Sequence, residues 1–287
     1  MIERNSNRKD ALKAKKRFGQ NFLKDEVVLH KIIQSMPNDD RRVVEIGPGL
    51  GDLTRYLVEK KDVTAFEVDQ DLCEHLRRRF ADAIGRDKLS LKCGDVLRHW
   101  EQESLERRPY HLVANLPYYI ATNIVLRALK DPYCQSLVVM VQKEVAEKFA
   151  AHPGQKNFSA LSVLAQSVGE VVSLFDVPPE AFVPAPKVVS SVLRIVKATS
   201  LNDEGFEDFL RKAFAQPRKT LAKNLSSGFD RADVAKALQT CGLQSSVRPH
   251  EVATSLYHHL YEILNQKGDM DGREKTSGQQ SRKETKR

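Results

Sequence analysis

The sequence predicts an α/β domain followed by a small all-helical domain, and three observations carry this prediction. The run Val43–Ile46, which is apolar except for Glu45, leads into the glycine-rich turn 47–51 and then into an amphipathic stretch, which is typical of the first strand, loop and helix of a βαβ unit. Six further runs of strand length follow up to residue 196, most of them separated by helical patterns. From about Leu201 onward the apolar residues keep only helical spacing.

Composition and charge limit the function. The chain has 287 residues, of which 41% are hydrophobic, and its net charge is +8. This length is enough for one large domain and one small one, and the positive charge suggests a polyanionic partner. We expect a basic flexible arm at 1–17, the α/β domain at 18–199, the helical domain at 200–265 and a disordered polar tail at 266–287.

Targeting signals and cysteines indicate the compartment. No apolar run approaches the about 20 residues of a membrane span, and the N-terminus lacks the apolar stretch of a secretory signal. We therefore expect a cytoplasmic protein without a membrane partner, with the mitochondrial matrix as the alternative. The cysteines show no metal-ligand spacing, so we expect isolated thiols in a reducing compartment, with neither disulfides nor a metal site. They are Cys73, Cys93, Cys134 and Cys241.

A basic arm precedes the first helix. Seven of residues 1–17 are Lys or Arg, and FGQNFL follows directly at Phe18–Leu23. The arm either contacts phosphates or is simply solvated, and the abrupt change to aromatic and amide residues favours a role at a site. Asp25 is positioned to cap a helix that runs to about Met36.

The glycine turn predicts the kind of ligand. Its glycines let a ligand approach the backbone closely. A dinucleotide fingerprint needs its third glycine at the position of Asp52, whose charge would also repel a pyrophosphate. The turn therefore favours a cofactor that contains an adenosine and no phosphates, and an ordinary tight turn is the alternative.

Acidic residues follow the next two strands where a nucleoside would need them. The second strand ends in Glu67, 20 residues after Gly47, an offset at which a carboxylate accepts hydrogen bonds from both ribose hydroxyls. Asp69 competes for this role but suits the N-cap of the next helix. Asp95 follows the strand Leu89–Cys93 and either accepts from an adenine amino group or is a turn residue.

The segment after the fourth strand indicates the chemistry. Tyr110–Asn115 fits a strand, and Pro117 ends it because proline lacks an amide donor. The amide oxygen of Asn115 and the carbonyl of Pro117 can accept both hydrogens of an adenine amino group, while Tyr118 stacks on the base. Acceptors out of the ring plane localise the nitrogen lone pair and direct it at a methyl donor. An ordinary strand-to-helix turn would explain the proline but not the amide and the aromatic together.

Three more strands complete the α/β domain, at 136–141, 171–176 and 188–196. The last two are joined by Val177–Lys187, whose four prolines make a stiff connection that is able to hold Phe182 out of the core. A buried Phe182 is the alternative.

Basic residues of the helical domain offer a second interaction surface. Arg218, Lys219, Lys223 and Arg248 could form one positively charged face, or they could be scattered, solvated charges. The last 22 residues, 266–287, have no periodic apolar positions, which is typical of a disordered tail.

An ordered set of motifs resembles one known family. FGQNFL, VVEIGPGLGDLT, FEVD, GDV and NLPYYI occur in this order, and VQKEVAEKF, VPPEAFVPAPKVVSSVLR and PRKTLAKNL follow them. Over about residues 15–260, this set is similar to the ribosomal RNA adenine dimethylase family, and in particular to its small-subunit branch, the kasugamycin-sensitivity dimethylases. The resemblance implies a Rossmann-like class I methyltransferase domain with a seven-stranded mixed sheet, followed by a small helical RNA-binding domain.

The same resemblance implies the reaction and the partners. The expected enzyme uses S-adenosyl-L-methionine (SAM) for the N6-dimethylation of adjacent adenines near the 3′ end of small-subunit (16S) rRNA during ribosome biogenesis. The expected partner is this rRNA within an immature subunit, the protein is expected to be a monomer, and no metal is needed. By motif match, the cofactor would be held by Asn21, Leu23, Gly47, Glu67, Asp95 and Asn115. The target adenine would be held and stacked by Asn115, Pro117, Tyr118 and Phe182.

Two segments depart from the family pattern. Asn157–Ala160 lacks the aromatic-Gly-Arg run of the family, and Pro217 stands where an Arg is expected. In both places a basic residue that could contact RNA is missing.

Four other functions share parts of the pattern. A large-subunit rRNA dimethylase of the antibiotic-resistance type acts on a different RNA, and the proline-rich segment and helical domain favour the small-subunit branch instead. A ribosome-assembly factor whose binding outweighs its chemistry would not need the intact Asn115–Tyr118 motif. A mitochondrial transcription factor of the same family is disfavoured by the short chain and the missing transit pattern. A DNA adenine methylase is the fourth alternative, because it methylates the same kind of amine.

Overall fold

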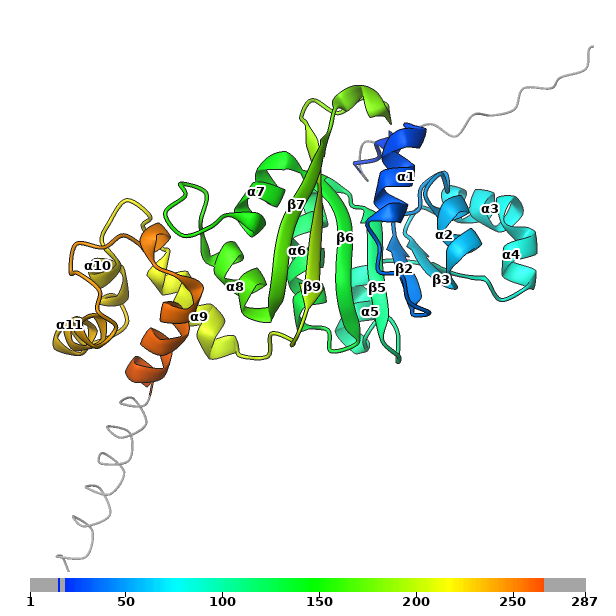
Figure 1. Cartoon of the computed structure of the whole chain (residues 1–287). Coiled ribbons are helices and arrows are strands. Elements are labelled where there is room, and N and C mark those ends of the chain that lie inside the picture. The colour runs from blue at the N-terminus through cyan, green and yellow to red at the C-terminus, as the bar shows by residue number, and fades with distance from the viewer. Residues whose placement is uncertain (1–14, 16–18, 266–287) are drawn as a thin grey trace, which may run out of the picture. The chain divides into compact units, whose positions relative to one another are not determined.

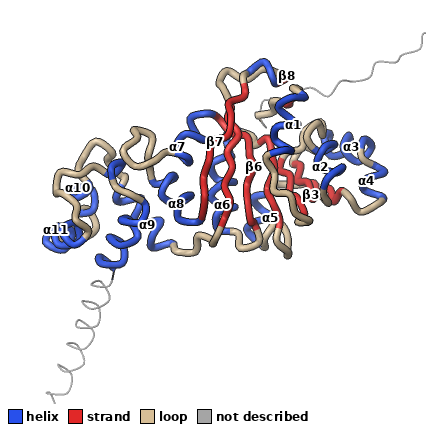
Figure 2. Tube along the Cα trace, in the orientation of Figure 1, coloured by secondary structure: helices blue, strands red, loops and turns tan. Residues whose placement is uncertain are grey.

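Seven strands form one sheet in the computed structural model, which describes residue 15 and residues 19–265. They are β2 (Arg42–Ile46), β3 (Val63–Glu67), β4 (Leu89–Cys93), β5 (Tyr110–Asn115), β6 (Cys134–Gln142), β7 (Gly169–Val177) and β9 (Ser190–Lys197). Their order across the sheet is β4-β3-β2-β5-β6-β9-β7 (Figure 1, Figure 2). The strands from β4 to β6 pair in parallel, and β9 runs antiparallel to β6. The predicted α/β fold with a mixed, seven-stranded sheet is confirmed.

The strand order creates a ligand site at the centre of the sheet. The chain moves outward from β2 through β3 to β4, and β5 then returns to pair with the other side of β2. Such a reversal leaves a crevice at the carboxyl ends of the two central strands, because their following loops diverge to opposite sides. The loops after β2 and β5, which carry the glycine turn and the segment from Asn115 to Tyr118, therefore meet at one point.

Seven α-helices lie between residues 26 and 150, and the last of them continues past residue 146 into the second compact unit. They are α1 (Glu26–Gln34), α2 (Thr54–Lys60), α3 (Gln70–Arg79), α4 (Ala81–Gly85), α5 (Val96–Gln102), α6 (Tyr118–Lys130) and α7 (Lys143–Ala150). Asp25 caps α1 as predicted, because its carboxylate accepts from the amides of Val27 and Val28 at 2.9 and 3.1 Å. Asp69 caps α3 by accepting from the amide of Asp71 at 3.1 Å.

A second, two-stranded sheet was not predicted. Its strands are β1 (Phe22–Leu23) and β8 (Phe182–Val183), which pair antiparallel. Strands of two residues are too short to give a periodic pattern, so sequence reading cannot detect them. Their pairing places the FGQNFL segment beside the proline-rich connection, and the amide of Lys24 extends it by donating to the carbonyl of Ala181 at 2.8 Å.

The glycine turn has no room for a side chain at Gly51. Its φ of +83° lies in the left-handed region, and a Cβ there would come within 2.4 Å of Cε2 of Phe80, a buried ring. The amide of Gly51 closes the turn by donating to the carbonyl of Pro48 at 2.9 Å. The turn is therefore packed directly against the core.

Replacing Gly51 by alanine should lower the free energy of unfolding by about 2–4 kcal/mol, the sum of a left-handed backbone penalty and an overpacking cost. Gly85 is the matched control, because its φ is not in the left-handed region and nothing lies within 4 Å of a Cβ added there. Gly85→Ala should change the free energy of unfolding by less than about 1 kcal/mol. Urea unfolding of both variants is the measurement, and equal effects would contradict the packing argument.

The cysteine prediction is wrong for two of the four residues. Cys73 of α3 and Cys93 at the end of β4 form a disulfide, with their Cα atoms 6.2 Å apart, whereas Cys134 and Cys241 are free thiols. The two partners are 20 positions apart in sequence, and only the return of the chain from α3 to β4 beside β3 brings them together. The absence of disulfides was the reason to expect a reducing compartment, and this bond removes that reason.

The second compact unit consists, among the described residues, of 147–169 and 201–265. Its helices are α8 (Ala160–Val168), α9 (Glu204–Ala213), α10 (Leu221–Leu225), α11 (Arg231–Thr240) and a helix over 254–265. The helical character after Leu201 agrees with the prediction. The segment 147–169 groups with these helices and not with the α/β domain, because its contacts lie far along the chain: Ser167 hydrogen-bonds to His258, 91 positions later, at 2.8 Å.

Two predicted segments cannot be compared with the structure. The basic arm, apart from Lys15, and the tail 266–287 lie outside the described residues. In the part of the chain that the structure describes, no helix is long and apolar enough to cross a membrane. In that same part, no group of three or more His, Cys, Asp or Glu side chains could hold a metal ion.

Candidate active site

The residues predicted to hold the cofactor line one pocket at the carboxyl ends of β2, β3, β4 and β5. Pro117 and Tyr118 line the same pocket, so eight of the nine predicted site residues lie together. The eight are Asn21, Leu23, Gly47, Glu67, Asp95, Asn115, Pro117 and Tyr118. Glu67 and Asn115 end β3 and β5, Gly47 directly follows β2, and Asp95 lies two residues after β4, which is where ligands bind in open α/β sheets.

Glu67 is buried and holds the glycine turn. Its side chain is 4% exposed, and its two oxygens accept hydrogen bonds from the amide of Gly49 at 3.1 Å and the amide of Asp69 at 2.9 Å. Burial raises the pKa of Glu67 above its ordinary value, although these two amides act in the opposite direction. The carboxylate thus connects the end of β3 to the loop after β2.

Asp95 serves as a turn residue and also faces the pocket. Its carboxylate caps α5 by accepting from the amide of Leu97 at 2.9 Å, and the residue lines the pocket. A carboxylate has two oxygens, so one cap bond leaves acceptor capacity for a ligand. The two sequence interpretations of Asp95 are therefore compatible.

The N-terminal segment, whose Gln20 lines the pocket, is held in place by side-chain contacts that sequence reasoning missed. Gln20 donates to a carboxylate oxygen of Asp69 at 3.1 Å, and Lys15 forms an ion pair with the other oxygen at 2.7 Å. The carboxylate of Asp69 is buried, so these partners replace the water that it would otherwise bind. The signal was present, because Gln20 belongs to FGQNFL and Asp69 to FEVD, but neither motif shows that the two meet.

Asn115 connects β5 to the same N-terminal segment. Its amide nitrogen donates to the backbone carbonyl of Asn21 at 3.0 Å. The amide nitrogen can only donate, and this bond directs it toward Asn21, so the amide oxygen is the group that is available as an acceptor. This bond fixes the orientation of the amide plane, on which the predicted chemistry depends.

Pro117 and Tyr118 begin α6 beside the glycine turn. Pro117 is the N-cap residue of α6, and its carbonyl accepts from the amide of Ile120 at 3.2 Å. A Cβ added to Gly47 would lie 3.7 Å from Cδ of Pro117, so the two loops are in near contact. The hydroxyl of Tyr118 is hydrogen-bonded to Oγ of Ser190 at 2.7 Å.

The prediction that the proline-rich connection holds Phe182 out of the core is wrong. Phe182 is 2% exposed, packs in the main hydrophobic cluster and is not among the residues that line the pocket. Its backbone pairs with Leu23 in the small sheet, which directs the ring inward. The role of Phe182 in stacking on a base remains a prediction that this placement does not support.

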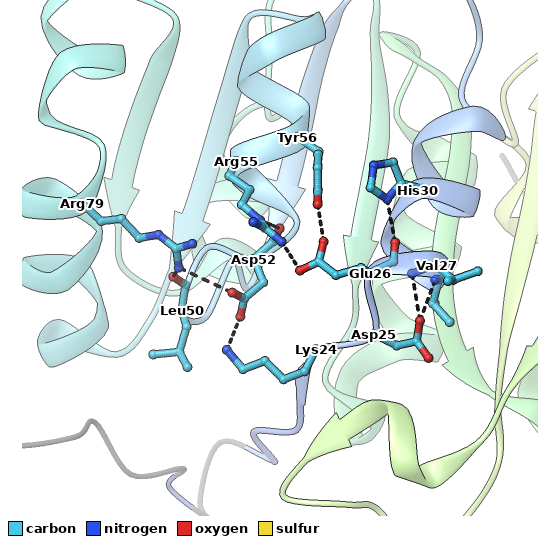
Figure 3. Close-up of polar contacts among 11 residues, drawn as sticks. Lys24, Asp25, Glu26, Val27, His30, Leu50, Asp52, Arg55, Tyr56 and Arg79 are labelled. Atoms are coloured by element: carbon cyan, nitrogen blue, oxygen red, sulfur yellow. Dashed lines mark hydrogen bonds and ion pairs between the residues drawn. The ribbon is translucent and has the colours of Figure 1, made fainter.

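A group of ion pairs offsets the charge of Asp52 beside the glycine turn (Figure 3). Lys24 pairs with this carboxylate at 2.5 Å, and a guanidinium nitrogen of Arg79 lies 3.6 Å from its other oxygen. Arg79 also donates to the carbonyl of Leu50 (Figure 3). Asp52 lines the pocket. Because Lys24 and Arg79 offset its charge, Asp52 repels a pyrophosphate less than the sequence suggests. The spacing of the glycines remains the reason to expect a cofactor without phosphates.

Glu45 is a further pocket residue that sequence reasoning passed over. It interrupts the apolar run of β2, is 2% exposed and lines the pocket. Burial raises the pKa of Glu45 to about 8, and the nearby charge of Glu67 acts in the same direction. The carboxyl group is therefore mostly protonated at neutral pH. A lone acid in an apolar strand before a glycine turn was the available signal.

Glu45→Gln should stabilise the protein at alkaline pH. The carboxyl has an ordinary pKa of 4.5 and a folded-state pKa of about 8, so between these values the folded state binds more protons than the unfolded state. The free energy of unfolding therefore falls as the pH rises from 5 to 9, by up to about 5 kcal/mol from this group alone.

Urea unfolding at several pH values measures this effect. Glu45→Gln should match the wild type near pH 5 and exceed it at pH 9, because the neutral amide cannot ionise. The exposed Glu59 of α2 is the matched control, and Glu59→Gln should keep the wild-type pH dependence. An unchanged slope in Glu45→Gln would show that Glu45 is not the group that titrates.

Comparisons with known proteins agree on one family. The family model described as ribosomal RNA adenine dimethylase matches residues 11–266. A protein of Sulfurimonas denitrificans named ribosomal RNA small subunit methyltransferase A is 55% identical over 264 residues, which are 92% of this chain and 97% of that protein. A protein of the same name from Aliarcobacter butzleri is 51% identical over 256 residues, which are 88% of this chain and 96% of that protein.

Solved structures show the same fold. The 23S rRNA methyltransferase ErmE is 25% identical with a TM-score of 0.67, and the match covers 85% of this chain and all of that one (100%). A dimethyladenosine transferase from Plasmodium falciparum is 23% identical with a TM-score of 0.74, over 86% of this chain and 98% of that one. Both matches extend well beyond the length of the α/β domain alone.

Proposed function

The chain belongs to the ribosomal RNA adenine dimethylase family, and from this premise we propose that its pocket binds SAM beside an adenine of small-subunit rRNA. The protein is an enzyme that dimethylates adenines of 16S rRNA. The proposed targets are adjacent adenines near the 3′ end of this RNA, modified during ribosome biogenesis in the cytoplasm by a monomer. The observation that supports this proposal best is the convergence of Glu67, Asp95 and Asn115 at three strand ends around one pocket.

The pocket residues fit the chemical groups of SAM. Each oxygen of Glu67 accepts one backbone amide and keeps a lone pair, which suits the two hydroxyls of a ribose. Asp95 uses one cap bond and retains an oxygen for the adenine amine. Gly47 has no side chain between the loop and the amino-acid end of the cofactor. When bound, SAM supplies an electrophilic methyl group on a positively charged sulfur.

Asn115 and Pro117 are proposed to hold the amine of the target adenine. The amine is a weak nucleophile because its lone pair is delocalised into the ring. The bond from Asn115 to the carbonyl of Asn21 fixes the amide, and its oxygen can then accept one amine hydrogen. The carbonyl of Pro117 accepts from Ile120 with one lone pair and keeps the second for the other hydrogen. Two such bonds draw the lone pair out of conjugation, and Tyr118 supplies a flat surface for the base.

The target adenine must leave its stack to reach this pocket. Unstacking costs a few kcal/mol in a duplex and less in a loop or junction, so a loop is the expected RNA context. The exposed side chains Arg218, Lys219, Lys223 and Arg248 are proposed to contact RNA phosphates. Lys223 also lines a groove of the helical unit together with Arg231, which adds a fifth cation to that unit's candidate RNA surface. The proposed partner is an immature small ribosomal subunit.

Transfer of labelled methyl groups tests the function. The purified protein is incubated with labelled SAM and with unmodified small subunits, large subunits or duplex DNA, and the modified bases are mapped. We expect two labelled methyl groups on each of the adjacent adenines of the small subunit, and background labelling elsewhere. Labelling of large subunits would favour the type of reaction named for ErmE, and labelling of DNA would contradict the RNA assignment.

A further inference from the structure

Tyr118 is attached to the interior of the sheet through its hydroxyl. Its oxygen lies 2.7 Å from Oγ of Ser190, the first residue of β9 and 72 positions further along the chain. Ser190 is completely buried (0% exposed) and pairs with Gln142 of β6 in the sheet register. The pocket aromatic is therefore connected to a buried position of the central sheet.

This attachment fixes the position of the ring. The backbone of Tyr118 is held at the first turn of α6, directly after Pro117, whose φ is −59°. A ring held only at this end can still swing about the first side-chain torsion between its staggered positions. The hydroxyl lies on the axis of the second torsion, so a contact there fixes the first torsion and with it the direction and position of the ring. A base can stack only on a ring that is held in a defined position.

We infer that Ser190 is a positioning residue for methyl transfer, which holds the Tyr118 ring in the position where it stacks on the target adenine. The inference rests on the proposed function, because it assigns Ser190 a role only through Tyr118. Burial raises the pKa of Tyr118 above its ordinary value, so the phenol stays protonated and the hydrogen bond persists at physiological pH. Ser190 itself is not among the residues that line the pocket.

The neighbouring serine provides a matched control. Ser191 is as buried as Ser190, with 1% exposed, but successive side chains of a strand point to opposite faces. Its hydroxyl donates to Asp176 at 2.5 Å and does not bond to Tyr118. Ser191→Ala therefore removes one buried hydroxyl hydrogen bond from the same strand without releasing the ring.

The test compares Ser190→Ala, Tyr118→Phe, the double variant and Ser191→Ala. Single-turnover methyl transfer to unmodified small subunits gives the rate constant, calorimetry gives the dissociation constant for SAM, and thermal unfolding reports on folding. We expect Ser190→Ala and Tyr118→Phe each to lower the rate constant about 10-fold, the scale of one hydrogen bond. The double variant should be no slower than either single one, because both remove the same bond. The affinity for SAM should stay within about 2-fold in all four.

Other outcomes overturn the inference. Wild-type rates in Ser190→Ala, additive losses of about 100-fold in the double variant, or an equal loss in Ser191→Ala would each show that Ser190 does not act through the ring. Tyr118→Ala separates this failure from failure of the proposed function. If Tyr118→Ala is inactive while Ser190→Ala is normal, the stacking role stands and the inference falls. If the wild type transfers no methyl group to small subunits, both fall.

Discussion

Replacing Asn115 by alanine should abolish methyl transfer while leaving SAM binding weakened but measurable. The amide oxygen is proposed to accept one hydrogen of the target amine, so its loss leaves the lone pair conjugated with the ring. Removing one polar group that stabilises a developing charge costs about 10²–10³-fold in rate, and here the nucleophile itself depends on that group, so the loss should be at least this large. Truncation also breaks the bond to the carbonyl of Asn21, which should weaken SAM binding by about 5-fold, the scale of one hydrogen bond.

The measurement is the single-turnover rate on unmodified small subunits, with calorimetric titration of SAM on the same preparation. Asn123 is the control, because it is an exposed asparagine on α6, and Asn123→Ala should behave as the wild type. Full activity of Asn115→Ala would refute the proposed chemistry. A variant that is inactive but still binds small subunits would also separate catalysis from any contribution of binding to ribosome assembly.

Much of the site could be predicted because it depends on strand ends. Parallel strands place their carboxyl ends at one edge of the sheet, so a glycine turn after β2 and an acid at the end of β3 must be neighbours. The sequence offset between Gly47 and Glu67 therefore predicts that the two residues are close in space. The carboxylate of Glu67 indeed binds the amide of Gly49 in that turn. The same reasoning applies to Asp95 and Asn115.

The features that sequence reasoning missed depend on contacts between distant segments. Phe182 is buried because β8 pairs with β1, and a pair of two-residue strands leaves no periodic signal. The bond between Cys73 and Cys93 arises where α3 returns to β4, at a distance that spacing alone does not give. The sequence places Ser190 only within a strand, since nothing local indicates that its hydroxyl meets Tyr118. In each case local residues specify the element and the tertiary fold selects the partner.

Glu67→Ala should weaken SAM binding by about 30- to 1000-fold. Two hydrogen bonds from ribose hydroxyls to a carboxylate are lost, and hydrogen bonds to charged groups contribute about 1.5–3 kcal/mol each, although such losses are rarely additive. The substitution also weakens the fold, because the amides of Gly49 and Asp69 lose the acceptor that holds the glycine turn against β3. Glu67→Ala should therefore also lower the free energy of unfolding by about 1–3 kcal/mol.

The pH dependence of binding provides an independent check on Glu67. Its pKa is raised by burial, and the ionised form is the one that accepts two ribose hydroxyls. Affinity of the wild type should therefore decline as the pH falls through this raised pKa, and Glu67→Ala should lack that decline. Calorimetry of wild type, Glu67→Ala and the exposed control Glu59→Ala across mildly acidic pH measures both effects. An unchanged dissociation constant in Glu67→Ala would contradict the proposed ribose contact. It would also remove the main reason to place the adenosine of SAM between β3 and the glycine turn.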